Sequence, residues 1–123
     1  MLFRSYVKTV LAALGQHRGI KALAHITGGG LLENIPRVLP QGMAARLEQG
    51  SWPRSELFAW LQQTGGIDDH EMNRTFNNGI GMVVVVDAAS ADAVAQTLRD
   101  GGETVYQIGS IEPRGAGAAV VVD

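Results

Sequence analysis

Two short stretches of the sequence hold residue types that could do chemistry together. The first, HITGGGLLENIPRVLP (residues 25–40), places three glycines between an apolar run and the start of an expected helix. A strand, a glycine run and a helix start can direct several backbone N–H groups at one point, which favours phosphate. The stretch lacks the Gly-Lys-Ser/Thr of a Walker A loop and the GxGxxG dinucleotide fingerprint. Gly28–Gly30 therefore indicate either a phosphate-binding loop or an ordinary tight turn.

His25 and Thr27 favour the phosphate-binding interpretation. Both project to the same face of the expected strand, at its carboxyl end, where open α/β sheets commonly bind ligands. A lone histidine in a strand is more often a structural residue than a catalyst, so it is the nearby glycines that make His25 a candidate.

The second stretch is MNRTFNNGIGM, residues 72–82, which leads into the most apolar strand of the chain. Arg74, Asn77 and Asn78 precede that strand, and an arginine beside amides and glycines suits a phosphate or a sugar hydroxyl. The alternative is a surface helix end in which Asn78-Gly79 is an ordinary turn.

A third polar run, Asp68-Asp69-His70-Glu71, carries residue types that ligate divalent ions. Asp68 and Glu71 also have capping-box spacing, and adjacent side chains of a helix point apart. We therefore predict a helix start here and assign no metal ligands.

The elements that must position these residues follow from hydrophobic periodicity. Helices are predicted over about residues 3–17, 31–38, 53–64, 68–76 and 90–98, and strands over 20–27, 43–47, 80–86, 104–111 and 118–122. Pro53 is expected in the first turn of its helix, after a cap at Ser51 or Trp52. The last two strands are predicted to form a hairpin, and IGMVVVV (80–86) a central strand covered on both faces.

Several helices are expected to bury an apolar side. Val7, Val10, Leu11 and Leu14 recur at helical spacing in the first helix. The buried side of the third helix is predicted to consist of Leu57, Phe58, Trp60 and Leu61. The aromatic residues Trp52, Phe58, Trp60 and Phe76 are predicted to lie in the core. The order of elements predicts one domain, residues 1–123, of the α/β class, with a mixed sheet of about five strands.

Composition excludes several classes of function. The 123 residues are 46% hydrophobic and 18% charged, with a net charge of −2 and no cysteine. A near-neutral chain has no general field for nucleic acid or anionic membranes, and without cysteine there are no disulfides or thiolate metal sites. No apolar run reaches the ~20 residues of a membrane span, and the N-terminus lacks a signal-peptide pattern. We predict a cytoplasmic protein that contacts neither nucleic acid nor membrane.

The two stretches together resemble the C-terminal domain of the aminoimidazole ribonucleotide synthetase family, also called phosphoribosylformylglycinamidine cyclo-ligases. HITGGGLLENIPRVLP is the most specific block, and MNRTFNNGIGM follows at the family's spacing. SWPRSELFAWLQQTGGIDDHEM, YVKTVL and YQIGSI fit as well, so the resemblance covers nearly the whole chain. One departure is a shorter spacing between the Ser-Trp pair and the proline, which we expect to shift only a surface turn.

This resemblance implies a three-layer α/β/α domain and a step of purine biosynthesis. The family uses ATP and Mg²⁺ to phosphorylate the formyl oxygen of formylglycinamidine ribonucleotide, and the imidazole ring then closes with loss of phosphate. Thr27 and Gly28–Gly30 are then expected to hold a phosphate of substrate or nucleotide. Asn34, Arg74 and Asn77 are expected as supporting contacts, and His25 as a polar or acid–base group near the formyl group.

The resemblance also implies partners. The family's N-terminal domain, which carries most ATP and Mg²⁺ ligands and forms a homodimer, has no counterpart in this sequence. The chain is therefore expected to be an excised domain with at most partial binding and no turnover.

Other interpretations remain open at this point. They are a related ATP-dependent enzyme (such as selenophosphate synthetase, thiamine-monophosphate kinase or a hydrogenase-maturation protein), a stand-alone binding module, and an interaction protein that self-associates through an uncovered apolar face.

Overall fold

The computed structural model describes residues 6–123 and contains five α-helices and five strands within them. The helices are α1 (Val7–Gln16), α2 (Gly30–Asn34), α3 (Glu56–Gly65), α4 (Asp69–Thr75) and α5 (Ala91–Asp100). The strands are β1 (Ile20–His25), β2 (Met43–Leu47), β3 (Met82–Val86), β4 (Gly109–Pro113) and β5 (Val120–Val122). Short 3₁₀ helices occupy Pro36–Val38, Gln49–Ser51 and Ala88–Ser90. The predicted mixed α/β class is confirmed.

The strands form two sheets, whereas the sequence predicted one. β1 pairs with β3, and β2 lies between β4 and β5. β2 is antiparallel to β4 and parallel to β5, so the predicted hairpin of the last two strands is wrong. β2 is hydrogen-bonded along both of its edges, and its residues Ala44, Ala45 and Leu47 are buried, which makes it the central strand of this sheet.

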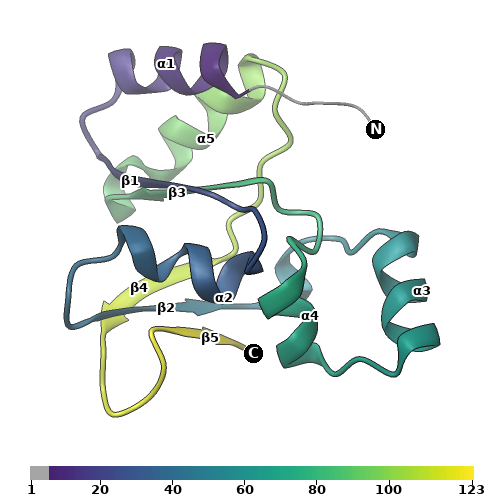
Figure 1. Ribbon diagram of the computed structural model, residues 1–123. Helices are drawn as coiled ribbons and strands as arrows, with labels where there is room; N and C mark the ends of the chain where they lie inside the picture. Colours follow the sequence, from purple (N-terminus) through teal and green to yellow (C-terminus); the bar gives the residue numbers. More distant parts are fainter. Residues whose placement is uncertain (1–5) are drawn as a thin grey trace. The chain divides into compact units, whose positions relative to one another are not determined.

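The described residues fall into two compact units. The first comprises residues 6–23 and 84–106, in which α1 packs on α5 (Figure 1). Its core is small: Ala13 of α1 meets Val94 and Leu98 of α5. Four partly buried residues complete it: Ile20, Val84, Val86 and Val105.

The apolar face predicted for α1 is largely uncovered. Val7 and Leu11 are more than 60% exposed and Leu14 is 42% exposed, so Ala13 is the residue of α1 that the unit buries. The expected start of this helix near residue 3 lies outside the described residues.

The second unit comprises residues 24–83 and 107–123 and carries most of the buried side chains. In it α2 covers one face of the β4-β2-β5 sheet and also packs against α4 (Figure 1). Its core consists of nine buried residues: Ala24, Ile26, Leu31, Ile35, Ala45, Leu47, Trp52, Ile80 and Val120.

Two helix starts show how local sequence determines the ends of elements. Asp68 caps α4 by accepting a hydrogen bond from the Glu71 N–H at 2.8 Å, as the capping-box spacing predicted. α3 begins later than expected, because Ser55 accepts from the Phe58 N–H and Pro53 lies before the helix. The prediction of a cap at Ser51 or Trp52 is therefore wrong.

The burial predicted for α3 is also wrong, because no residue of this helix is buried. Leu57 is 61% exposed and Trp60 is 58% exposed, whereas Trp52 is 5% exposed and belongs to the core. β3 is half-buried along its whole length and is not a fully covered central strand.

Candidate functional site

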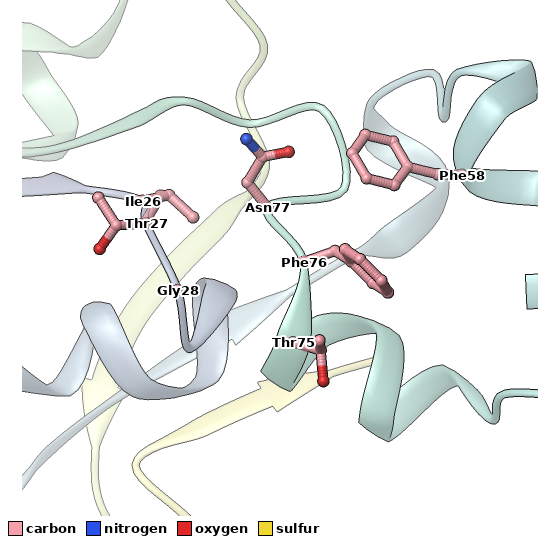
Figure 2. Close-up of a pocket in the computed structure, with 7 residues that line it drawn as sticks. All are labelled: Ile26, Thr27, Gly28, Phe58, Thr75, Phe76 and Asn77. Atoms are coloured by element: carbon pink, nitrogen blue, oxygen red, sulfur yellow. The ribbon is translucent and has the colours of Figure 1, made fainter. Parts of the chain in front are cut away.

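A pocket of about 230 Å³ in the second unit brings the two candidate stretches together (Figure 2). Three segments line it: the residues that follow β1, one side chain of α3, and the end of α4 with the loop after it. The lining residues are Ile26, Thr27, Gly28, Phe58, Thr75, Phe76 and Asn77. Thr27, Gly28 and Asn77 were predicted as site residues, and none of the seven carries a charge.

The glycine loop turns sharply between Thr27 and Gly30, whose N–H donates to the Thr27 carbonyl at 2.9 Å. Gly29 and Gly30 have φ of +99° and +59°, which residues with a side chain rarely adopt. A Cβ on Gly30 would also lie 2.2 Å from the carbonyl oxygen of Asn73 in α4. Gly28 has an ordinary φ and open space around it, so neither conformation nor packing requires glycine there.

Asn34 holds this loop together from α2. Its Nδ2 atom donates to the carbonyl of Gly30 at 2.8 Å and to those of Thr27 and Gly28 at 3.3 Å. Its Oδ1 atom accepts from Thr27 Oγ1 at 3.4 Å and from Arg37 at 3.2 Å. Asn34 is 4% exposed and does not line the pocket. Its carboxamide therefore supports the loop and is not free for a ligand.

The carbonyl groups of Thr27, Gly28 and Gly30 thus accept hydrogen bonds, whereas two N–H groups of the loop donate none. Within residues 6–123, neither the Gly28 N–H nor the Gly29 N–H has a hydrogen-bond partner. Gly28 lines the pocket. Unpaired backbone donors beside open space are what a phosphate or another oxygen-rich group requires.

Arg74 contacts acidic side chains and does not line the pocket. Its guanidinium binds Glu71 on α4 through a short ion pair and a second hydrogen bond of 2.9 Å, and it lies 3.5 Å from Glu33 on α2. The hydrogen bond from Arg74, followed by the one from Thr75, lowers the pKa of Glu71, and Glu71 raises the pKa of Arg74. Arg74 therefore links α2 to α4 in this structure.

His25 is the last residue of β1 and Thr27 lies two residues beyond it, so the strand is shorter than the predicted 20–27. Both are exposed, while Ala24 and Ile26 are buried. His25 is not among the pocket-lining residues, and its side chain makes no hydrogen bond or ion pair within the described chain. The structure thus places Thr27 at the pocket and His25 beside the pocket-lining segment.

Phe58, Thr75 and Phe76 line the pocket but were not predicted as site residues. The rings of Phe58 and Phe76 are 5.8 Å apart at their centroids, with planes inclined by 56° (Figure 2). Both are half-buried, so they form an aromatic wall and not part of the core as predicted. Phe58 comes from α3, far away in the sequence, and no local pattern links it to the glycine loop.

Residues 6–123 contain no cluster of three or more His, Asp or Glu side chains that could hold a metal ion. In the same part of the chain, no helix is long and apolar enough to cross a membrane.

Residues 3–122 match the family described as "AIR synthase related protein, C-terminal domain". The chain belongs to this family. The resemblance of the HITGGGLLENIPRVLP and MNRTFNNGIGM blocks is thereby confirmed. Both of these sequence blocks contribute residues to the pocket lining, together with Phe58.

Curated relatives with high identity are named phosphoribosylformylglycinamidine cyclo-ligase. One from Polaromonas sp. is 77% identical over 119 residues, one from Albidiferax ferrireducens is 73% identical over 119, and one from Bordetella petrii is 61% identical over 120. Each alignment covers 97% of this chain but 34% of the relative. The chain thus spans about a third of the length of the curated relatives it matches.

Solved structures with the same fold include two other kinds of protein. The chain resembles HypE of E. coli with a TM-score of 0.71 and 18% identity, over 97% of this chain and 35% of that one. It resembles thiamine-monophosphate kinase from Stenotrophomonas maltophilia with a TM-score of 0.62 and 19% identity, over 85% and 32%. At such identities the likeness shows the fold alone, so the related enzymes considered from sequence gain no support as the function.

Proposed function

We propose that the chain is the C-terminal third of a phosphoribosylformylglycinamidine cyclo-ligase. The observation that carries the proposal is the 77% identity to the Polaromonas relative of that name across 119 residues. The reaction is the one that the resemblance implies. The formyl oxygen of formylglycinamidine ribonucleotide takes the γ-phosphoryl group of ATP, the amidine nitrogen attacks the formyl carbon, and phosphate leaves as aminoimidazole ribonucleotide forms.

In this proposal the pocket is the chain's half of the substrate site. The N–H groups of Gly28 and Gly29 bind an oxygen of a phosphate, and Thr27 and Asn77 add polar contacts. The absence of a Cβ at Gly28 supports this role, because nothing else around it requires glycine. Asn34 keeps the loop carbonyls turned away from the ligand by hydrogen-bonding them.

Two further candidates have supporting roles. Arg74 is proposed to balance negative charge beside the loop. Its ion pairs with Glu71 and Glu33 hold the guanidinium outside the pocket lining, so no direct contact with the ligand is assigned to it. His25 is proposed as a polar or acid–base group near the formyl group, because it is exposed at the end of β1, two residues before Thr27.

The remaining ligands are proposed to come from the rest of the enzyme. The described residues lack an acidic or histidine cluster that fits Mg²⁺. We therefore assign the binding of ATP and Mg²⁺ mainly to an N-terminal domain, which the longer relatives are large enough to contain. Residues 1–123 are proposed to act as one domain beside it, in a homodimeric cytoplasmic enzyme. Turnover by the chain alone is not expected.

A chimaera tests the proposal. Residues 3–122 would replace the matching third of the Polaromonas cyclo-ligase, and purified protein would be assayed for ADP and aminoimidazole ribonucleotide. Activity close to that of the unaltered relative is expected. A chimaera that folds and dimerises like the relative but forms no product would overturn the proposal. A second chimaera with Gly28→Val is the control for the pocket: it is expected to fold equally well and lose activity.

A further inference from the structure

Asn77 and Asn78 form a turn whose inner residue is buried. The Asn77 carbonyl accepts from the Ile80 N–H at 3.0 Å, and φ is +53° at Asn78 and +92° at Gly79. Positive φ at both central positions is typical of a type I′ turn, for which Asn-Gly is the preferred pair. Such turns ordinarily lie at the surface, but Asn78 is 1% exposed. A turn role alone therefore does not explain Asn78.

Asn78 is held by hydrogen bonds to α4 and to Trp52, which lies 26 residues earlier in the chain. Its Nδ2 atom donates to Asn73 Oδ1 in α4 at 2.6 Å, and its carbonyl accepts from the Trp52 indole N–H at 3.1 Å. Asn73 and Trp52 are themselves buried. Asn78 Oδ1 is buried without a partner among the described residues. Rotating the Asn78 amide would set its oxygen against Asn73 Oδ1 and leave Nδ2 unpaired instead, and a polar atom retained at that cost indicates a specific role.

The turn fixes which atoms Asn77 can offer to the pocket. Asn77 Oδ1 accepts from the Gly79 N–H at 2.9 Å. A backbone N–H can only donate, so the side-chain atom that faces it must be the oxygen. The Asn77 NH₂ group has no partner within residues 6–123 and is left as a donor at a pocket without charged side chains.

We propose that Asn78 is a positioning residue for Asn77. It fixes the orientation in which the NH₂ group of Asn77 is a free donor at the pocket. The pocket thereby selects a ligand with an oxygen acceptor beside the wall formed by Phe58 and Phe76. The ligand half of this inference rests on the proposed function, and the positioning half does not. Asn77 is then the specificity-determining contact, and the buried bonds to Asn73 and Trp52 make its orientation independent of the ligand.

Hydrogen exchange of the full chain tests the positioning half without any ligand. Asn78→Gly keeps the left-handed backbone but removes the side chain, and Asn77→Ala removes the acceptor of the Gly79 N–H. Both are expected to speed exchange of the Gly79 amide by about tenfold. Thr64→Ala, an exposed change in α3, should leave it unchanged. The Ala45 N–H, bonded to Ala119, reports general unfolding and should keep its rate.

Glycine satisfies a type I′ turn fully, so an Asn78→Gly chain with the original Gly79 exchange rate would show that Asn78 is a turn residue only and overturn the inference. If Asn78→Gly also accelerates the Ala45 amide, Trp52→Phe takes its place. It removes the indole N–H that the Asn78 carbonyl accepts together with part of the ring, so exchange of the Gly79 amide is compared with that of the Ala45 amide, and Gly79 exchange is expected to speed up more than Ala45 exchange, by a smaller factor than in Asn78→Gly.

A titration with formylglycinamidine ribonucleotide tests the ligand half. Asn77→Ala and Asn78→Gly are expected to weaken binding about five- to tenfold relative to the unaltered chain and Thr64→Ala. Equal affinity in all four chains would overturn the specificity role while leaving the proposed function intact. Absence of binding by the unaltered chain would overturn the proposed half-site, and with it the ligand half, whereas the exchange result would still decide the role of Asn78.

Discussion

Gly30 lies so close to Asn73 that a Cβ atom placed on it would come within 2.2 Å of the Asn73 carbonyl oxygen. This contact joins the glycine loop to α4, and α4 ends at the pocket-lining residues Thr75–Asn77. Gly30→Ala combines a left-handed backbone with a backbone clash, so we expect it to lower the free energy of unfolding by about 3 kcal/mol. Urea denaturation measures this. Gly28→Ala is the matched control and should change stability by less than about 0.5 kcal/mol.

Asn34→Ala removes the donor shared by three loop carbonyls. Because Asn34 is buried, those groups lose a partner that water cannot readily replace, and we expect a loss of about 2 kcal/mol. Arg37→Ala, which removes one contact from an exposed side chain, should cost less than about 1 kcal/mol. Equal effects of the two changes in urea denaturation would contradict the supporting role of Asn34.

The Glu71 carboxylate gives a pH dependence with a defined sign. Arg74 and then Thr75 lower its pKa below the ordinary value of 4.5, so its contribution to stability is present above that value and is lost as the pH falls through the folded-state pKa. A ¹³C NMR titration of the Glu71 carboxyl should therefore have its midpoint below 4.5. Arg74→Gln should move the midpoint upward, and an unmoved midpoint would contradict the ion pair.

Removal of the two tryptophan side chains should change the stability of the chain by very different amounts. Trp52 is in the core and donates to Asn78, so Trp52→Ala is expected to cost about 3–5 kcal/mol or to prevent folding. Trp60 is 58% exposed, and Trp60→Ala should change stability by less than about 1 kcal/mol. Tryptophan fluorescence provides the readout, since removal of Trp60 should leave a blue-shifted, buried spectrum. A large loss on removing Trp60 would mean that α3 is packed more tightly than the structure shows.

Sequence reasoning located most elements because their signals are local. The alternation in residues 20–27 predicted a strand with His25 and Thr27 on the same side, and the structure exposes both of them while it buries Ala24 and Ile26. The Asp68 cap was likewise predictable from spacing within one turn of helix. Thr27, Gly28 and Asn77 were predicted as site residues from two blocks, and the structure brings them to one pocket.

The failures concern long-range pairing and burial. Nothing in the sequence around β4 and β5 tells that each pairs with β2 and not with the other. Helical spacing of Leu57 and Trp60 predicts an apolar face but not whether anything covers it. Asn34 and Arg74 were expected as supporting contacts from the family resemblance, which did not indicate that Asn34 bonds loop carbonyls and that Arg74 pairs with two carboxylates. Which partner each of these side chains contacts depends on the three-dimensional arrangement of segments that are not adjacent in the sequence.

The proposal that this chain carries a preformed half-site for formylglycinamidine ribonucleotide is tested by an NMR titration of the ¹⁵N-labelled chain with that compound. Amide shifts are expected to centre on Thr27–Gly29 and Thr75–Asn77, with the Asn77 side-chain NH₂ among them. Mg-ATP alone should leave these signals unmoved. Shifts produced by Mg-ATP instead, or none at these residues with the ribonucleotide, would contradict the proposal.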